Sequence, residues 1–162
     1  MARYTRPKRV VKQAQQARSG KSHVFEGITF PSGLELYMWK ALKVAGIKAE
    51  YESEKFSLMS PFILKNEVWE RKANGKGDML KKTDANIRGM MYTPDFIIRK
   101  PNGTIHMIIE TKGYANESFP LRWKLFKQVV HTSFPDVVLF KPQKQTECDF
   151  TVQRILQLQN DR

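Results

Sequence analysis

Cysteine, histidine and long apolar runs are scarce in this chain, and each scarcity excludes a class of protein. The single cysteine, Cys148, excludes an internal disulfide framework and fits a reducing cytoplasm. No Cys or His stands at ligand spacing from His131, so we expect no zinc site there. No apolar stretch reaches the roughly 18 residues that span a bilayer, and no apolar segment follows the basic N-terminus as it does in a signal peptide. We therefore expect a cytoplasmic protein without a membrane partner.

Acidic residues are also few. The chain has 28 Lys and Arg against 16 Asp and Glu, which gives a net charge of +12. Residues 1–22 carry seven basic residues and no acidic one, and the remainder keeps a charge of +5. Because basic surfaces follow phosphates, nucleic acid is the expected partner. The first segment is predicted to be a flexible DNA-binding arm, or alternatively a solubilising tail; its candidate contacts are Arg3, Arg6, Lys8 and Arg9.

Length and composition indicate one globular domain. The chain has 162 residues, of which 41% are hydrophobic and 11% aromatic, enough to bury a core. We place this domain at residues 23–162, with a basic insertion at about residues 60–89. The insertion holds seven basic and four acidic residues. It is either a flap that closes over DNA, with Trp69 available for stacking, or an ordinary surface insertion with Trp69 in the core.

Sequence patterns predict an α/β organisation. Ser32 and Gly46 are expected to start and end a helix, because serine favours the N-cap and glycine the left-handed C-cap. A second helix is expected at about residues 118–131, with Leu121, Leu125 and Val129 on its apolar face and Phe126 and Val130 adjacent to it. The other predicted elements are a small hairpin about Glu26-Gly27, strands at 48–52, 56–59 and 137–140, and a closing helix at about 150–158.

A hairpin at residues 91–113 is the most informative segment. Asn102-Gly103 is typical of a two-residue type I′ turn, and such a turn places Asp95 opposite Glu110, with β-carbons about 5 Å apart. One face then carries Phe96, Ile98, Ile105, Met107 and Ile109. A three-residue Pro-Asn-Gly loop or a bulge would leave the two carboxylates neighbours but no longer directly opposite.

Opposed carboxylates destabilise a sheet unless a cation lies between them. A hard divalent metal ion is the expected cation, since it binds carboxylate oxygens. Lys112 follows Glu110 by two positions, so it lies on the same face. In the alternative interpretation, Asp95 only solvates a strand start. Glu110 and Lys112 then form a surface salt bridge worth at most about 1 kcal/mol.

These residues resemble the PD-(D/E)XK nuclease signature. Pro94-Asp95 and Glu110-Thr111-Lys112 carry the resemblance, with Ser32-Gly33-Leu34-Glu35 upstream, and phage-encoded Holliday-junction resolvases are the most similar group. The resemblance runs from about Phe30 to Pro142. It implies a restriction-endonuclease-like core with a mixed β-sheet flanked by helices. It also implies a DNA endonuclease that uses one or two Mg²⁺ or Mn²⁺ ions per site, and a homodimer that acts on branched DNA in recombination.

The resemblance also implies roles for individual residues. Asp95, Glu110 and the Thr111 carbonyl would bind metal, and Lys112 would orient water or stabilise charge. Glu35 would complete the site through a second metal or a bound water, although a capping box with Ser32 also explains it. On the second helix, Lys124 or Lys127 would contact phosphate, although a charged stripe is also an ordinary solvated face. Alternative functions are another PD-(D/E)XK nuclease (nicking, end-processing, transposon-end or restriction type) and a catalytically silent DNA-binding or packaging module.

Overall fold

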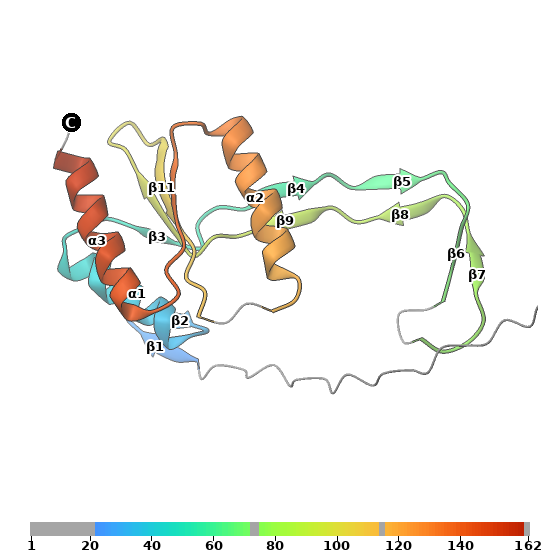
Figure 1. Cartoon of the computed structure of the whole chain (residues 1–162), viewed down its shortest axis with the longest axis horizontal. Coiled ribbons are helices and arrows are strands. Elements are labelled where there is room, and N and C mark those ends of the chain that lie inside the picture. The colour runs from blue at the N-terminus through green and yellow to red at the C-terminus, as the bar shows by residue number, and fades with distance from the viewer. Residues whose placement is uncertain (1–21, 72–74, 114–115, 161–162) are drawn as a thin grey trace, which may run out of the picture.

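A four-stranded mixed sheet forms the centre of the molecule (Figure 1). The structure is a computed structural model that describes residues 22–71, 75–113 and 116–160. The strand order is β12–β11–β10–β3, in which β11 and β12 are parallel and the other neighbours antiparallel. These strands are β3 (Glu50–Tyr51), β10 (Phe96–Arg99), β11 (Ile105–Ile109) and β12 (Val138–Phe140).

Helices cover both faces of this sheet, which confirms the predicted α/β class with a mixed sheet flanked by helices. Figure 1 shows α1 (Gly33–Val44) and α3 (Gln145–Asn160) together on one side and α2 (Phe119–Ser133) on the other. The first side buries a core that includes Met38, Leu42, Phe96, Met107, Cys148 and Ile155. The second side buries Phe56, Tyr92, Ile97, Ile108, Phe126 and Val130. No helix in the described part of the chain is long and apolar enough to cross a bilayer.

The predicted start of the fold is confirmed. β1 (His23–Phe25) and β2 (Ile28–Phe30) form a hairpin whose turn residues, Glu26 and Gly27, both have positive φ. Ser32 caps α1, and Gly46 follows the helix with a φ of +69°. The closing helix α3 is longer than predicted, and β3 is shorter.

The turn of the β10–β11 hairpin is not the predicted type I′ turn. Lys100 N–H donates to Thr104 O and Gly103 N–H to Lys100 O, so Pro101, Asn102 and Gly103 form a three-residue loop. Gly103 has a φ of +83°, whereas a type I′ turn needs positive φ at Asn102 as well. The prediction was wrong because a proline before Asn-Gly favours the first central position of a type I turn.

The predicted register is nevertheless found at the end of the hairpin away from the turn. The three-residue loop shifts the pairing, so that Arg99 lies opposite Ile105. His106 is then the extra residue of a β-bulge, which restores the predicted pairing. The restored pairs are Phe96–Ile109, Ile97–Ile108 and Ile98–Met107.

The bulge has two consequences for the faces of the sheet. Ile105 packs on the α2 side and not, as predicted, with Phe96 and Ile98. Beyond the bulge the alternation is as predicted, so Asp95 and Glu110 remain opposite each other. The two irregularities, loop and bulge, therefore cancel before they reach the carboxylates.

The buried face of α2 is centred on Phe126 and Val130, which were predicted to lie beside the leucine stripe, and not on Leu121. Leu121 is 60% exposed, whereas Phe119, Phe126 and Val130 are buried against the sheet. Aromatic residues decide the orientation, because Phe126 stacks on Tyr92 with ring centroids 4.4 Å apart.

The predicted insertion is a long two-stranded ribbon that extends away from the body (Figure 1). Its pairs are β4 (Phe56–Met59) with β9 (Met90–Tyr92), β5 (Phe62–Leu64) with β8 (Ala85–Ile87), and β6 (Val68–Glu70) with β7 (Leu80–Lys82). Trp69 is 55% exposed on this ribbon, so the interpretation that placed it in the core was wrong. Three lysines of the ribbon are paired with acids on the opposite strand: Lys65 with Asp84, Lys81 with Glu67, and Lys82 with Glu70.

Candidate active site

The candidate site lies where β10 begins and where β11 and β12 end. Asp95 directly precedes β10 and Glu110 directly follows β11, so they continue the pairing of Phe96 with Ile109. Opposed residues of an antiparallel pair point to the same face. Asp95 and Glu110 alternate with Phe96 and Ile109, and they therefore lie on the α2 side of the sheet. The opposition of the two carboxylates is the arrangement predicted from the sequence.

Thr111 holds Asp95 in place. The Thr111 backbone N–H donates to Asp95 Oδ2 over 2.6 Å, and its hydroxyl donates to the same oxygen over 2.5 Å. Both donations go to Oδ2, which leaves Oδ1 for another contact. Thr111 is itself buried, with 5% of its surface exposed. The orientation of the half-buried Asp95 carboxylate is therefore fixed from β11.

Glu110 is more deeply buried and less well satisfied. Only 6% of the residue is exposed, and its buried Oε2 has no hydrogen-bond partner in the described part of the structure. The hydroxyl of Tyr92 also lacks a hydrogen bond of normal geometry, although Tyr92 is close enough to lower the pKa of Glu110. Incomplete hydrogen bonding of a buried carboxyl group is costly, and a bound cation is one way to complete the contacts of this oxygen.

Both carboxyl groups are shifted toward their protonated forms. Loss of water contact is the main cause, and it raises the pKa of Asp95 to about 7 and that of Glu110 to about 8. The Asp95 charge adds to the rise at Glu110, and Glu35 raises the pKa of both groups. The Thr111 hydrogen bonds to Asp95 and the charge of Lys112 act in the opposite direction. Groups that interact in this way titrate as a pair, and perturbed carboxylates are common in functional sites.

Glu35 stands at the edge of the same site, in the first turn of α1. Its Oε1 accepts a hydrogen bond from the Ser32 hydroxyl over 2.8 Å, and its Oε2 accepts one from the Tyr51 hydroxyl over 2.9 Å. Ser32 Oγ also accepts from Glu35 N–H, which caps the helix. Glu35 therefore takes part in the cap and also contributes negative charge to Asp95 and Glu110. The capping interpretation is therefore confirmed, and the role of Glu35 in an active site stays a prediction.

Lys112 lies over an aromatic ring of α2. Its Nζ is 4.8 Å from the centre of the Phe119 ring, an arrangement typical of a cation–π contact. No ion pair joins Lys112 to an acid within the described residues. The alternative of a surface salt bridge between Glu110 and Lys112 is therefore wrong. Lys112 is positioned near the carboxylates, and its ammonium group remains available for an anion.

The donor set of this site fits a hard divalent cation. Among the described residues, no three His, Cys, Asp or Glu side chains are grouped so that they alone could hold a metal ion. A cation here would use Asp95 and Glu110, with further oxygens from the Thr111 carbonyl, water or phosphate. Mg²⁺ usually binds in this way, through one or two carboxylates while it keeps several waters. The unpartnered Oε2 of Glu110 and the raised pKa values agree with this choice.

The structure does not bring every predicted site residue to this place. Lys124 and Lys127 are exposed on α2, without an ion pair or ring contact to the carboxylate region. The cation of α2 that does approach it is Arg122, which lies 5.7 Å from the Tyr92 ring centre and donates to Met91 O. The predicted contacts of the N-terminal segment, namely Arg3, Arg6, Lys8 and Arg9, lie outside the described residues.

Sequence reasoning missed the hydroxyl and aromatic groups of the site. Tyr92 lies three positions before Asp95, and this closeness was a usable signal. Tyr51 and Phe119 come from elements far along the chain, and no local pattern marks them. The Thr111 side chain also escaped notice, because only its carbonyl was expected to matter.

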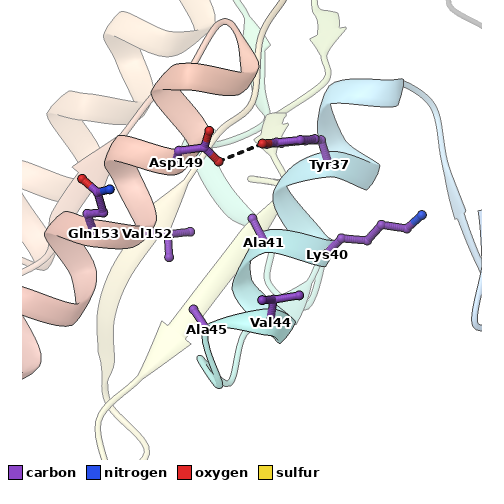
Figure 2. Close-up of a pocket in the computed structure, with 8 residues that line it drawn as sticks. All are labelled: Tyr37, Lys40, Ala41, Val44, Ala45, Asp149, Val152 and Gln153. Carbon is purple, nitrogen blue, oxygen red and sulfur yellow. Dashed lines mark hydrogen bonds between the residues drawn. The ribbon is translucent and has the colours of Figure 1, made fainter.

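A hollow of about 540 Å³ lies between α1 and α3, away from the carboxylates (Figure 2). Ala41, Val44, Ala45 and Val152 line it, and a hydrogen bond of 2.9 Å from Tyr37 to Asp149 crosses between the helices. Its lining contains none of the predicted site residues. A second hollow, of about 470 Å³, is lined by residues that include Leu34 and Gly113, the sequence neighbours of Glu35 and Lys112.

The Thr111 hydroxyl gives a direct test of this geometry. We expect Thr111→Val to weaken Mg²⁺ binding about tenfold at pH 7, a magnitude common for residues that orient metal ligands. The variant loses one of two donations to Asp95 Oδ2, which raises the pKa of Asp95 further. Isothermal titration calorimetry would measure the affinity, with Thr111→Ser as the control that keeps the hydroxyl. Equal affinities for the two variants would show that the hydroxyl does not orient Asp95.

Comparison with known proteins places the chain in a family. No curated protein and no solved structure gives a significant match. A family model matches residues 16–146, which is most of the chain and includes all the carboxylates of the site. Its description is a protein of unknown function (DUF1064), so the match carries no activity with it. The chain belongs to the DUF1064 family.

Proposed function

We propose that this protein is a Mg²⁺- or Mn²⁺-dependent DNA endonuclease with a PD-(D/E)XK-type site. The observation that carries the proposal is the opposition of Asp95 and Glu110 on adjacent strands, with a buried oxygen of Glu110 that has no hydrogen bond of normal geometry. A fold gains nothing from two opposed carboxylates whose burial raises both pKa values unless a cation binds between them. Lys112, without an acidic partner, supplies the third residue of the signature.

The residues of the site divide the work of phosphodiester hydrolysis. Asp95, Glu110 and the Thr111 carbonyl would hold the metal, which lowers the pKa of a bound water and neutralises charge on the phosphate. Thr111 keeps Asp95 oriented through two hydrogen bonds. The Lys112 ammonium would orient the attacking water or stabilise charge on the phosphate oxygens. Glu35, fixed by Ser32 and Tyr51, would hold a water or a second metal at the edge.

Branched DNA is the proposed substrate, and a homodimer the proposed assembly. The net charge of +12 supports a polyanionic partner. The preference for a Holliday junction rests on the resemblance to phage resolvases. Two copies would place two sites on opposing strands and would recognise shape and backbone, because phosphate contacts carry no sequence information.

Cleavage of a labelled four-way junction, beside a linear duplex of equal length, tests the proposal. We expect paired nicks in the junction with Mg²⁺ and none with EDTA. Lys112→Ala should cleave at least about 100-fold more slowly, a loss typical of a group that stabilises transition-state charge. Lys100→Ala is the control for loss of one positive charge, because Lys100 lies beyond the end of β10, at the hairpin loop.

Other outcomes of the same experiment distinguish the alternatives. Equal cleavage of junction and linear duplex would replace the resolvase by a nicking, end-processing, transposon-end or restriction-type nuclease. DNA binding without cleavage under either metal would replace the enzyme by a DNA-binding or packaging module. Unchanged cleavage by Lys112→Ala would remove Lys112 from the site.

A further inference from the structure

Lys141 occupies a position beside the carboxylate pair that the nuclease signature does not include. β12 runs parallel to β11, with Ile109 opposite Phe140. Two hydrogen bonds continue the pairing past the last strand residues, from Glu110 N–H to Phe140 O and from Lys112 N–H to Pro142 O. In a parallel ladder these bonds place Lys141 directly beside Glu110.

Asp95, Glu110 and Lys141 therefore form one row across three neighbouring strands. Paired residues of adjacent strands point to the same face, which here is the α2 side. Lys141 would be expected to form an ion pair with Glu110 at this spacing. Within the described residues it forms no ion pair, and Glu110 Oε2 remains without a partner.

The Lys141 ammonium is directed to the same ring as Lys112. Its Nζ is 5.9 Å from the Phe119 ring centre, and that of Lys112 is 4.8 Å from the same centre. Two like charges that share one ring repel each other, and an anion between them would remove this repulsion. Lysine side chains are flexible point charges that bind phosphate well, so the two groups can converge on phosphate oxygens of a substrate.

We propose that Lys141 is a substrate-binding residue that holds a DNA phosphate next to the carboxylate pair. The inference deepens the proposed nuclease function and rests on it. Lys112 acts at the reacting phosphodiester. Lys141, at the end of β12, contributes affinity for the DNA and fixes the position of its backbone. Loss of Lys141 therefore affects binding more than turnover, whereas loss of Lys112 affects turnover.

DNA binding as a function of salt, together with cleavage kinetics, tests this role. Lys141→Met keeps most of the aliphatic stem over Phe119 and removes the charge. With Ca²⁺ in place of Mg²⁺, fluorescence anisotropy should give a Kd for duplex DNA roughly tenfold higher than that of the wild type. The slope of log Kd against log salt concentration should fall by about 0.9, the value for one lost phosphate contact. Under Mg²⁺ the KM should rise by a similar factor with kcat nearly unchanged.

Matched variants separate this role from a structural one. Lys141→Arg should restore most of the affinity. Lys100→Met changes a lysine at the hairpin loop, and it should leave the Kd, the salt slope and the KM near the wild-type values. A salt slope and KM equal to those of the wild type in Lys141→Met would overturn the inference. A fall in kcat alone would also overturn it, because Lys141 would then act in the chemical step. A wild-type protein that binds DNA without cleaving it would instead overturn the proposed function, and the slopes would still decide the role of Lys141.

Discussion

Replacing Asp95 by asparagine is expected to abolish cleavage and, in the same protein, to raise the stability of the metal-free state. Asparagine keeps an oxygen that can accept both Thr111 donations, so the local geometry survives. It removes a charge whose ionisation is disfavoured by burial and by Glu35, and which in turn raises the pKa of Glu110. We expect cleavage to fall at least about 1,000-fold, since charge stabilisation is usually the largest catalytic contribution. In EDTA at pH 8 the free energy of unfolding should rise by about 2 kcal/mol.

Thermal unfolding in EDTA and a junction-cleavage assay in Mg²⁺ would measure the two effects. A gain of about 2 kcal/mol corresponds to roughly 5 °C in Tm for a chain of this size. Asp136→Asn is the matched control, because Asp136 is an exposed carboxylate in the loop before β12. A variant that lost activity and also lost stability would indicate a structural role for Asp95. A variant that kept Mg²⁺ affinity would remove Asp95 from the metal site.

The position of the carboxylate pair was predictable because a side chain in a sheet points either to one face or to the other. A slip by one would send Asp95 into the core beside Met38 and Leu42, where a carboxylate is costly. The cost of burying Asp95 favours this register even though the turn type was predicted wrongly. The bulge at His106 compensates for the three-residue loop. Hydrophobic alternation supported the register that was predicted from the turn dipeptide, and that register is found near the site although the turn type was wrong.

The groups that surround the pair were not predictable, because they come from distant segments. Phe119 reaches Lys112 and Lys141 because α2 buries its aromatic side, where Phe126 stacks on Tyr92. The spacing of Leu121, Leu125 and Val129 predicted the neighbouring stripe, since it counts apolar residues without their shapes. The interpretation that placed Trp69 in the core failed for another reason. A ribbon that projects from the body leaves apolar residues exposed, and periodicity cannot distinguish it from a buried strand.

The second large effect concerns pH and metal together. The folded-state pKa values of Asp95 and Glu110 lie above their ordinary values, at about 7 and about 8. Between about pH 4 and pH 8 the folded state therefore binds more protons at these groups than the unfolded state. The contribution of the pair to stability is complete below the unfolded pKa and is lost as pH rises through the folded pKa values. In EDTA we expect Tm to fall as pH increases from 5 to 8.5.

Added Mg²⁺ should reverse this fall, and its effect should grow with pH. Metal binds the ionised carboxylates, so protons compete with it up to the raised pKa values. A ligand that binds only the folded state stabilises it by RT ln(1 + [L]/Kd), which is about 2.7 kcal/mol at 100 times Kd. We therefore expect the difference in Tm between Mg²⁺ and EDTA to be near zero at pH 5 and several degrees at pH 8.5, measured by scanning calorimetry.

Other groups titrate over the same range, and the Asp95→Asn variant isolates the pair from them. Groups outside the pair are the same in both proteins, so their contributions cancel when the two curves are subtracted. The wild-type curve minus the variant curve then reports the carboxylates alone. That difference should slope downward with pH in EDTA and flatten in Mg²⁺. A difference that does not change with pH or metal would mean that groups of the protein already balance the charges of Asp95 and Glu110. A cation between the two carboxylates would then not be needed.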